Sequence, residues 1–146
     1  MPEPVTTIIG FDFGTRWIGV AIGQTLTGKA RPLRAIDSVD WVAIKKLIDT
    51  WQPQRFIVGL PLNMAGEQQE MSDRAERFGR QLRGRFGIPA EMVDERLTTR
   101  EAYLLAIENT KRHSKTDIDS LSAVLITESW LNLNTTCQSS KLADQH

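Results

Sequence analysis

The strongest constraint on the fold of this chain is a pair of apolar runs near its amino terminus. The runs, Val5–Phe13 and Trp17–Gln24, are separated by only three residues, the first of which is Gly14. β-Branched and aromatic residues are frequent in both runs, and such residues are typical of β-strands. A connection this short joins antiparallel neighbours, because parallel strands need a crossover of a dozen or more residues. The sequence therefore predicts a β-hairpin at the start of a sheet.

After the hairpin, the sequence predicts one more strand and then an alternation of helices and strands. Arg31–Ile36 has the pattern of a third strand, and Ser38-Val39-Asp40 begins a helix that Pro53 ends. The later elements are the strand Arg55–Leu60, the loop Pro61–Gln69, the helix Ser72–Phe86, the strand Pro89–Val93, a helix from Thr98 to about Asn109, the polar loop Lys111–Thr116 and the helix Asp117–Leu133. Three strands in hairpin order followed by this alternation predict an α/β fold, in which helices cover a mixed sheet.

The length of the chain predicts a single domain. A chain of 146 residues buries about two-thirds of the surface that its unfolded state exposes. We expect this domain to cover residues 1–133. The segment 134–146 is polar, lacks periodicity and is expected to be a flexible tail.

Composition limits the partners and the compartment. Lys and Arg together number 18, as do Asp and Glu, so a polyanion would bind only where positive charge is locally concentrated. No apolar run approaches the ~20 residues that span a bilayer, and no basic region precedes the first apolar run, as it would in a secretory signal. The single cysteine, Cys137, has no partner in the chain for a disulfide. These features favour a cytoplasmic protein without a membrane partner.

Asp12 is unusual because it is a carboxylate inside an apolar strand, between Phe11 and Phe13. Aspartate is depleted in strands and is almost never buried without a partner. Gly10 and Gly14 remove side chains on both sides of it, so that another group can approach the backbone closely. The pattern favours a metal ligand at the mouth of a sheet with open space above it. The alternative is a strand-end aspartate that hydrogen-bonds the adjacent turn.

Asp94 and Glu95 form a second acidic candidate, at the point where the last strand ends. Only one of the two can point with Asp12, because successive side chains in a strand alternate between faces. An exposed turn in which Arg96 pairs with an acid explains the same spacing equally well. The residues alone leave both the choice and the role open.

Asp117 and Asp119 form a third acidic candidate, at the start of the last helix. Ser122 and Ala123 lie on the same face as Asp119 and are small enough to let the helix approach the sheet. Acids in a first helical turn are also favoured by the helix dipole, which gives both residues a structural explanation. Asp117 lies on another side of the helix and is expected to face solvent.

In this interpretation, three acids from distant segments converge at one end of the sheet. Carboxylates at close range repel one another and raise each other's pKa unless a cation lies among them. Oxygen ligands suit Mg²⁺ or Mn²⁺. The two histidines and the one cysteine lie in a polar loop and in the terminal segment, which argues against a zinc site.

Five motifs, taken in order, resemble those of the YqgF/RuvX family. The motifs are FDFGTRWIGVAIG, ARPL, IVGLPLNMAG, DERLTT and DSLSAV, and the resemblance extends from about Thr7 to Trp130. Members of this family are described as Holliday junction resolvases or pre-rRNA nucleases. The resemblance implies a ribonuclease H-like fold: a mixed five-stranded sheet with three antiparallel-connected strands, then two parallel ones, and helices on both faces.

The resemblance also implies which acids are catalytic. Carried over motif by motif, the catalytic and metal-binding residues are Asp12 in DFGT, Glu95 in DER and Asp119 in DS-x-S-A. It thereby selects Glu95 over Asp94, and Asp119 over Asp117. The implied cofactor is Mg²⁺ or Mn²⁺, as two ions that Asp12 contacts together. In many enzymes of this fold, the second catalytic acid comes from the strand that corresponds to IVGLPLN in this chain. That segment contains no acidic residue here, so Glu95 of the following strand has to replace the missing acid.

The implied activity is metal-dependent hydrolysis of phosphodiester bonds in nucleic acid. Processing of the 5′ end of pre-16S rRNA is the preferred task, and resolution of Holliday junctions is the alternative. The expected nucleic-acid contacts are Arg16, Arg31, Arg96, Asn63, Arg74 and Arg77. Arg74 and Arg77 belong to a run of arginines on one helix that is equally typical of a solvated face. The protein is expected to be a monomer or a weak homodimer.

Two other classes of function stay open on the sequence alone. A non-catalytic RNA-binding factor of ribosome assembly would keep the fold without needing the acids. An ATP-binding protein of the actin-like class also begins with a strand–Asp–Gly–Thr hairpin. That fold needs two such domains, and 146 residues supply only one half of it.

Overall fold

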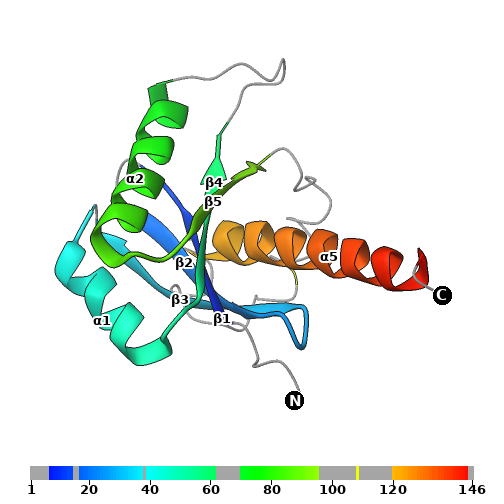
Figure 1. Ribbon diagram of the computed structural model, residues 1–146. Coiled ribbons are helices and arrows are strands. Elements are labelled where there is room, and N and C mark those ends of the chain that lie inside the picture. The colour runs from blue at the N-terminus through cyan, green and yellow to red at the C-terminus, as the bar shows by residue number, and fades with distance from the viewer. Residues whose placement is uncertain are drawn as a thin grey trace.

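A computed structural model describes residues 7–14, 17–37, 39–61, 70–95, 108 and 120–144, with side chains up to residue 133. Within these ranges the chain forms a five-stranded sheet with helices on both faces (Figure 1). The strands are β1 (Thr7–Asp12), β2 (Trp17–Gln24), β3 (Lys29–Asp37), β4 (Arg55–Leu60) and β5 (Ala90–Asp94), and the helices are α1 (Trp41–Trp51), α2 (Glu70–Phe86) and α5 (Leu121–Asp144).

The strands follow the order β3-β2-β1-β4-β5 across the sheet. β1 pairs antiparallel with β2, and β2 pairs antiparallel with β3, whereas the pairs β1–β4 and β4–β5 are parallel. The predicted mixed sheet is therefore confirmed. Parallel pairing brings the carboxyl ends of β1, β4 and β5 to one edge of the sheet, where ligands of open α/β sheets bind.

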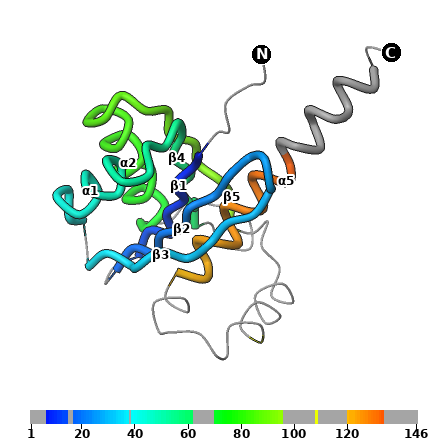
Figure 2. Tube along the Cα trace, turned by 90° about the horizontal axis from the view of Figure 1, so that it is seen from below, coloured from blue at the N-terminus to red at the C-terminus, as the bar shows by residue number. Residues whose placement is uncertain are grey.

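The helices divide the core into two parts. Figure 1 shows α1 and α2 on one face of the sheet and α5 on the other, and Figure 2 shows the same separation from below. The core under α1 and α2 is built around Phe11, whose ring contacts those of Phe56 and Phe78. The core under α5 is smaller and includes Ile8 and Ile57. Side chains of one strand thus alternate between the two cores.

Local signals set both ends of α1. The side chain of Asp40 accepts hydrogen bonds from the backbone N–H groups two and three residues later, both at 3.1 Å, and so caps the amino terminus. At the other end, Gln52 takes a left-handed conformation with φ of 49° and donates its N–H to the carbonyl of Ile48 at 2.8 Å. The helix predicted at this position is confirmed.

Several element boundaries differ from the predicted ones, and two of the differences have a physical reason. β3 covers Lys29–Asp37 rather than Arg31–Ile36, because its pairing with β2 extends to the hairpin turn. α5 continues to Asp144, so the backbone of the segment predicted as a flexible tail is helical. No glycine or proline lies between Leu121 and Asp144, so the helix meets no residue that would end it at position 133.

Some predicted elements lie wholly or largely outside the described residues. They are the loop Pro61–Gln69, the helix from Thr98 to Asn109 and the polar loop Lys111–Thr116. Among the helices that the structure does describe, none is long and apolar enough to cross a membrane.

α5 lies against the sheet where two neighbouring strands carry glycine. A Cβ atom at Gly10 of β1 would lie 1.7 Å from Oγ1 of Thr127, and one at Gly23 of β2 would lie 2.9 Å from Cγ2 of the same residue. Thr127 is fully buried, and its hydroxyl donates to the carbonyl of Ala123 at 2.7 Å. The bare surface of β1 and β2 is therefore filled by α5. At Gly10, the group that approaches the backbone closely, as the sequence predicted, is Thr127 of α5.

Replacement of Gly10 by alanine tests this packing. The new methyl group would collide with Thr127, so Gly10→Ala is expected to destabilise the fold by about 1–3 kcal/mol, as over-packing of a core does. Gly84 of α2 is the matched control, because nothing lies within 4 Å of its Cβ position. Gly84→Ala is expected to stabilise the protein by about 0.5–1 kcal/mol. Denaturant unfolding of both variants measures these changes, and an unchanged Gly10→Ala variant would contradict the packing of α5.

Candidate active site

Asp12 and Glu95 lie at the carboxyl ends of β1 and β5, on the face of the sheet that α5 covers. Gly10 lies two residues before Asp12 and faces α5, and Val93 lies two residues before Glu95 in the core under α5. Alternation along a strand gives the two acids the same orientation as these neighbours and turns Asp94 to the opposite face. The side chains of Asp12 and Glu95 approach one another closely enough that a hydrogen bond to Asp12 is among the causes that raise the pKa of Glu95. The structure therefore brings Glu95 to Asp12, as predicted, although their catalytic role stays a prediction.

Gly59 of β4 makes room for this contact. β4 lies between β1 and β5, and a Cβ atom at Gly59 would be 2.7 Å from Glu95 Oε1 and 2.7 Å from Cδ1 of Ile126. The Glu95 carboxyl group thus occupies the space that a side chain of β4 would fill. The lack of an acid in β4 has a physical reason, because an acid from the next strand takes its place.

Asp12 favours the protonated form of Glu95. A hydrogen bond between them requires a hydrogen on one, since an ionised carboxylate only accepts. Burial is the largest cause that raises the pKa of Glu95, and the hydrogen bond to Asp12, the charge of Asp12 and the charge of Asp94 add to it. Together they raise this pKa to about 9. Without a cation, Glu95 is therefore protonated at neutral pH.

One oxygen of Glu95 has no partner in the described part of the chain. Glu95 Oε1 is buried there and forms no hydrogen bond. Such an unsatisfied acceptor costs about 1–3 kcal/mol, so native proteins keep one only where something else satisfies it. A hard divalent cation such as Mg²⁺ or Mn²⁺ prefers oxygen ligands of this kind. The residues present therefore fit the metal that the sequence predicted.

The third predicted ligand, Asp119, lies outside the described residues, and no group of three acidic, histidine or cysteine side chains within them is placed to hold a metal ion. The next residue, Ser120, is described. Its buried hydroxyl donates to the carbonyl of Leu33 at 2.6 Å and accepts from the N–H of Val20 at 3.1 Å. Ser120 thereby fixes the start of α5 to β2 and β3. Sequence reasoning missed this role because the partners are 87 and 100 positions away.

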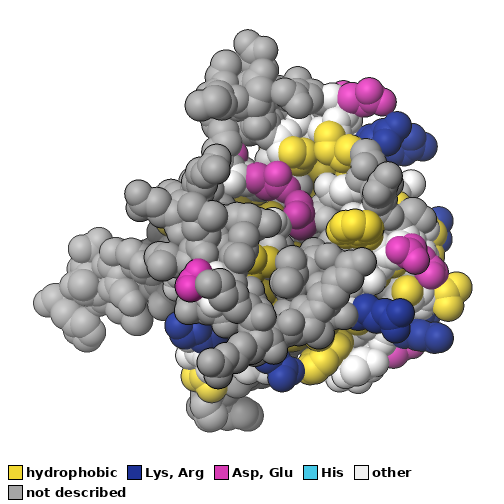
Figure 3. Space-filling model, turned by 180° about the vertical axis from the view of Figure 1, so that it is seen from behind, with side chains coloured by type: hydrophobic (Ala, Val, Ile, Leu, Met, Phe, Trp, Pro, Cys, Tyr) yellow, Lys and Arg dark blue, Asp and Glu magenta, His cyan; other side chains and the backbone are white. Residues whose placement is uncertain are grey.

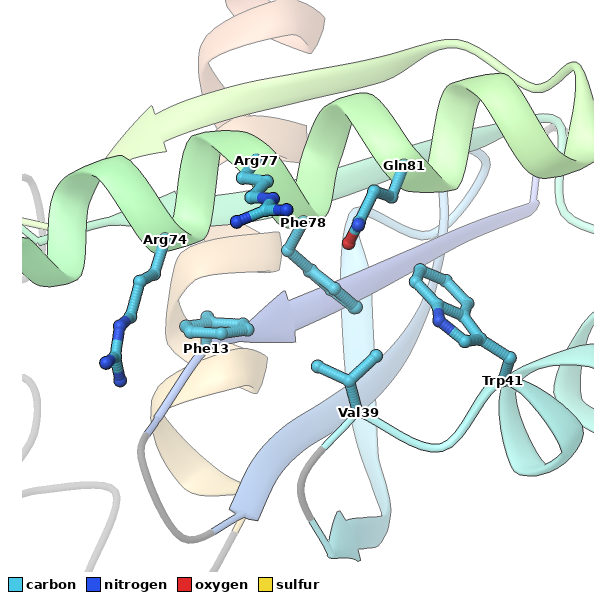
Figure 4. Close-up of a pocket in the computed structure, with 7 residues that line it drawn as sticks. All are labelled: Phe13, Val39, Trp41, Arg74, Arg77, Phe78 and Gln81. Carbon is cyan, nitrogen blue, oxygen red and sulfur yellow. The ribbon is translucent and has the colours of Figure 1, made fainter.

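The predicted nucleic-acid contacts fall into three groups. Arg74 and Arg77 of α2 line a cavity together with Phe13, the residue after Asp12 (Figure 4). Arg31 lies on the edge strand β3, two strands from β1, and its guanidinium carbon is 5.4 Å from the centre of the Trp51 ring. The structure therefore does not bring Arg31 to Asp12. The remaining three, Arg16, Arg96 and Asn63, lie outside the described residues.

Charges of both signs are mixed on the surface drawn in Figure 3. Acidic and basic side chains are interspersed there, with hydrophobic side chains between them. This distribution agrees with the equal numbers of acidic and basic residues in the chain. A polyanion therefore has to be held by a smaller, local cluster of cations.

Residues 6–133 match the model of a family described as RuvX: Holliday junction resolvase. The chain belongs to this family. A RuvX-family relative from Aeromonas salmonicida, named "Putative pre-16S rRNA nuclease", is 51% identical over 131 residues, which are 86% of this chain and 94% of the relative. A protein of the same name from Azotobacter vinelandii is 50% identical over 130 residues, which are 85% of this chain and 92% of the relative.

Solved structures similar to this RuvX-family chain show its fold. T. thermophilus RuvC in complex with a Holliday junction substrate has a TM-score of 0.56 at 13% identity, and the match covers 85% of this chain and 91% of the RuvC chain. The yeast mitochondrial Holliday junction resolvase Ydc2 has a TM-score of 0.51 at 9% identity, and the match covers 88% of this chain and 79% of Ydc2. At identities this low the likeness concerns the fold alone. The predicted ribonuclease H-like fold is confirmed.

Protonation of Glu95 predicts how stability without metal depends on pH. Folding raises the pKa of Glu95 from its ordinary value of 4.5 to about 9, so the stability that this group contributes is complete below pH 4.5 and is lost as the pH rises towards 9. Glu95→Gln removes the ionisation. The variant is therefore expected to lose less stability than the wild type as the pH rises through this window. Melting temperatures in the presence of a chelator measure the difference.

Asp94→Asn is the control for this measurement. Asp94 is the smallest of the causes that raise the pKa of Glu95, so this variant should keep most of the pH dependence of the wild type. Parallel curves for the wild type and Glu95→Gln would show that Glu95 is ionised in the folded protein, against the geometry described above.

Proposed function

We propose that this protein is a divalent-metal-dependent nuclease that processes the 5′ end of pre-16S rRNA. The observation that carries the proposal is the Asp12–Glu95 pair, in which burial and the proximity of Asp12 raise the pKa of Glu95 and one buried oxygen of Glu95 has no partner among the described residues. Such a pair is costly in a structural role and becomes favourable around a cation. The names of the relatives support a ribosomal RNA precursor as the substrate.

In this proposal Asp12, Glu95 and Asp119 are the metal ligands. Asp12 ends the central strand of the sheet, which holds its carboxylate more rigidly than a loop would. Glu95 reaches over Gly59 and gives up its proton when a cation binds, because the carboxylate is the ligand form. Two bound Mg²⁺ or Mn²⁺ ions would lower the pKa of an attacking water and stabilise the charge on the leaving 3′ oxygen. The reaction needs no nucleophilic side chain.

Resolution of Holliday junctions is the second candidate, which the description of the matched family supports. A resolvase cuts two strands symmetrically and therefore acts as a dimer, whereas a single cut in a precursor needs one active site. We propose that this protein acts in the cytoplasm as a monomer or a weak homodimer, which suits the RNA substrate.

A direct competition decides between the two substrates. The purified protein is given Mn²⁺ with a labelled rRNA precursor and a labelled four-way DNA junction, in separate reactions and then mixed. Faster cleavage of the RNA supports the proposed function. Symmetric nicking of the junction with the RNA left intact would replace it by the resolvase function.

Substitution of Asp12 separates catalysis from folding. Asp12→Asn is expected to lower the cleavage rate by more than the 10–100-fold that is typical for outer-shell partners of a metal. In chelator the variant should melt no lower than the wild type, because asparagine has nearly the same size as aspartate and its amide oxygen can still accept a hydrogen bond from protonated Glu95. Mn²⁺ should raise the melting temperature of the wild type and leave that of the variant unchanged.

The other acids complete this series. Glu95→Gln and Asp119→Asn are expected to behave like Asp12→Asn but less severely, whereas Asp94→Asn and Asp117→Asn should keep most of the activity. Full cleavage in excess chelator, or by Asp12→Asn, would contradict the metal mechanism. RNA binding without cleavage in every form of the protein would instead support a non-catalytic assembly factor.

A further inference from the structure

Two cavities between α1 and α2 share the side chain of Trp41. The first has a volume of about 330 Å³, and Figure 4 shows Phe13, Val39 and Trp41 converging on it beneath α2. The second has a volume of about 520 Å³ and lies between the start of α1 and the end of α2, with Val42 and Phe86 in its lining. Both volumes are typical of ligand sites. We name the two cavities together the α1–α2 groove.

The α1–α2 groove concentrates positive charge. All of its charged lining residues are cations: Arg74, Arg77, Lys45, Lys46 and Arg85. Arg74 pairs with Glu70 at 3.3 Å and Lys45 pairs with Asp49 at 2.9 Å. No described residue forms a salt bridge with the other three. A chain with equal numbers of acidic and basic residues thus has here the local excess of positive charge that a polyanion requires.

The polar lining of α2 forms one stripe along the helix. Its members follow one another at spacings of three or four residues: Arg74, Arg77, Gln81 and Arg85. Such spacings place side chains on one side of a helix, and at 1.5 Å per residue the stripe is about 16 Å long. It begins at the cavity beside Phe13 and ends where Arg85 lies 4.3 Å from the centre of the Trp41 ring. The stripe therefore leads away from the strand end that carries Asp12.

Aromatic rings accompany these cations. The half-buried ring of Phe13 lies 5.3 Å from that of Phe78, and Trp41 stacks on Phe78 at 5.8 Å while it lines both cavities. Rings beside cations are the platform on which proteins hold single-stranded nucleic acid, because a base stacks on the ring while its phosphate contacts the cation. The bases of a duplex stay stacked on one another and do not reach such a platform.

We propose that the α1–α2 groove binds the single-stranded segment of RNA next to the scissile bond. Bases stack on Phe13 and on the guanidinium of Arg85, which itself lies over the Trp41 ring, and phosphates contact the other cations of the stripe. Asp12 and Phe13 are consecutive residues at the end of β1 and point to opposite faces of the sheet, so a strand of RNA that crosses this end contacts both. The inference deepens the proposed function and rests on it for the identity of the substrate as RNA.

Charge reversal on α2 tests the groove. The groove variant carries Arg77→Glu and Arg85→Glu, and the control variant carries Arg80→Glu and Arg83→Glu. All four arginines are exposed, and Arg80 and Arg83 line a different cavity of α2. Both variants change the net charge equally, so long-range attraction is matched. The probe is a fluorescent oligouridylate of about 15 nucleotides in excess chelator, whose binding is followed by anisotropy without cleavage.

The groove variant is expected to bind the oligouridylate at least about tenfold more weakly than the control variant, with a smaller dependence on salt. A blunt RNA duplex should bind both variants equally. Equal weakening of oligouridylate binding in both variants would overturn the proposal. The groove variant could instead bind the oligouridylate as well as the wild type does but sediment differently from it. This result would overturn the RNA-binding proposal and indicate that the groove is a contact between two copies of the chain.

Cleavage assays with Mn²⁺ keep this proposal separate from the nuclease proposal. Asp12→Asn is expected to lose cleavage and to bind the oligouridylate as tightly as the wild type. The groove variant is expected to raise KM and leave kcat unchanged. If binding depends on the groove but no form of the protein cleaves RNA, the nuclease proposal is contradicted and the groove proposal is supported. If the groove and control variants have the same KM, the groove proposal is overturned and the nuclease proposal is unaffected.

Discussion

The close contact of α5 with the bare surface of β1 and β2 determines where the parts of the candidate site lie. Thr127 packs against Gly10 and Gly23, at positions where a Cβ atom of either residue would collide with it. Seven residues earlier, or about 10 Å along the helix, the Ser120 hydroxyl bridges β2 and β3. These two contacts fix the position of α5 along the sheet. Ile126 is thereby held beside the Glu95 carboxyl group.

At the candidate site the carboxyl group of Glu95 is buried, although burial disfavours its ionised form, and the rest of the described core avoids this conflict. Burial contributes most to the raised pKa of Glu95, and the charge of Asp12 contributes less. Burial would therefore raise the pKa of Glu95 even beside a neutral neighbour, because ionisation requires something that compensates for lost hydration. A bound cation would provide this compensation. Arrangements that lower the stability of the fold locally are expected at functional sites, because the packing around the site holds them in place.

Local patterns in the sequence predicted most of the fold, and contacts between distant segments explain what they missed. The short hairpin at Gly14 and the cap at Asp40 depend on neighbours in the chain, and both elements were predicted. The partners of Gly59 and Gly10 belong to other elements, so sequence reasoning saw a missing acid in the strand of Gly59 and predicted a close approach at Gly10 without identifying the group that approaches. The α1–α2 groove was likewise invisible, although two of its arginines had been singled out, because its lining comes from β1, α1 and α2 together.

The central claim is that Asp12 and Glu95 form a metal site that is filled only when Glu95 gives up its proton. Calorimetric titration of Mn²⁺ at pH 7, in buffers with different ionisation enthalpies, counts the protons released on binding. With a pKa of about 9 for Glu95, the wild type should release about one proton, and the number should fall towards zero as the pH passes that value. Glu95→Gln should release none. Tight binding of Mn²⁺ to the wild type at pH 7 without release of a proton would contradict the account.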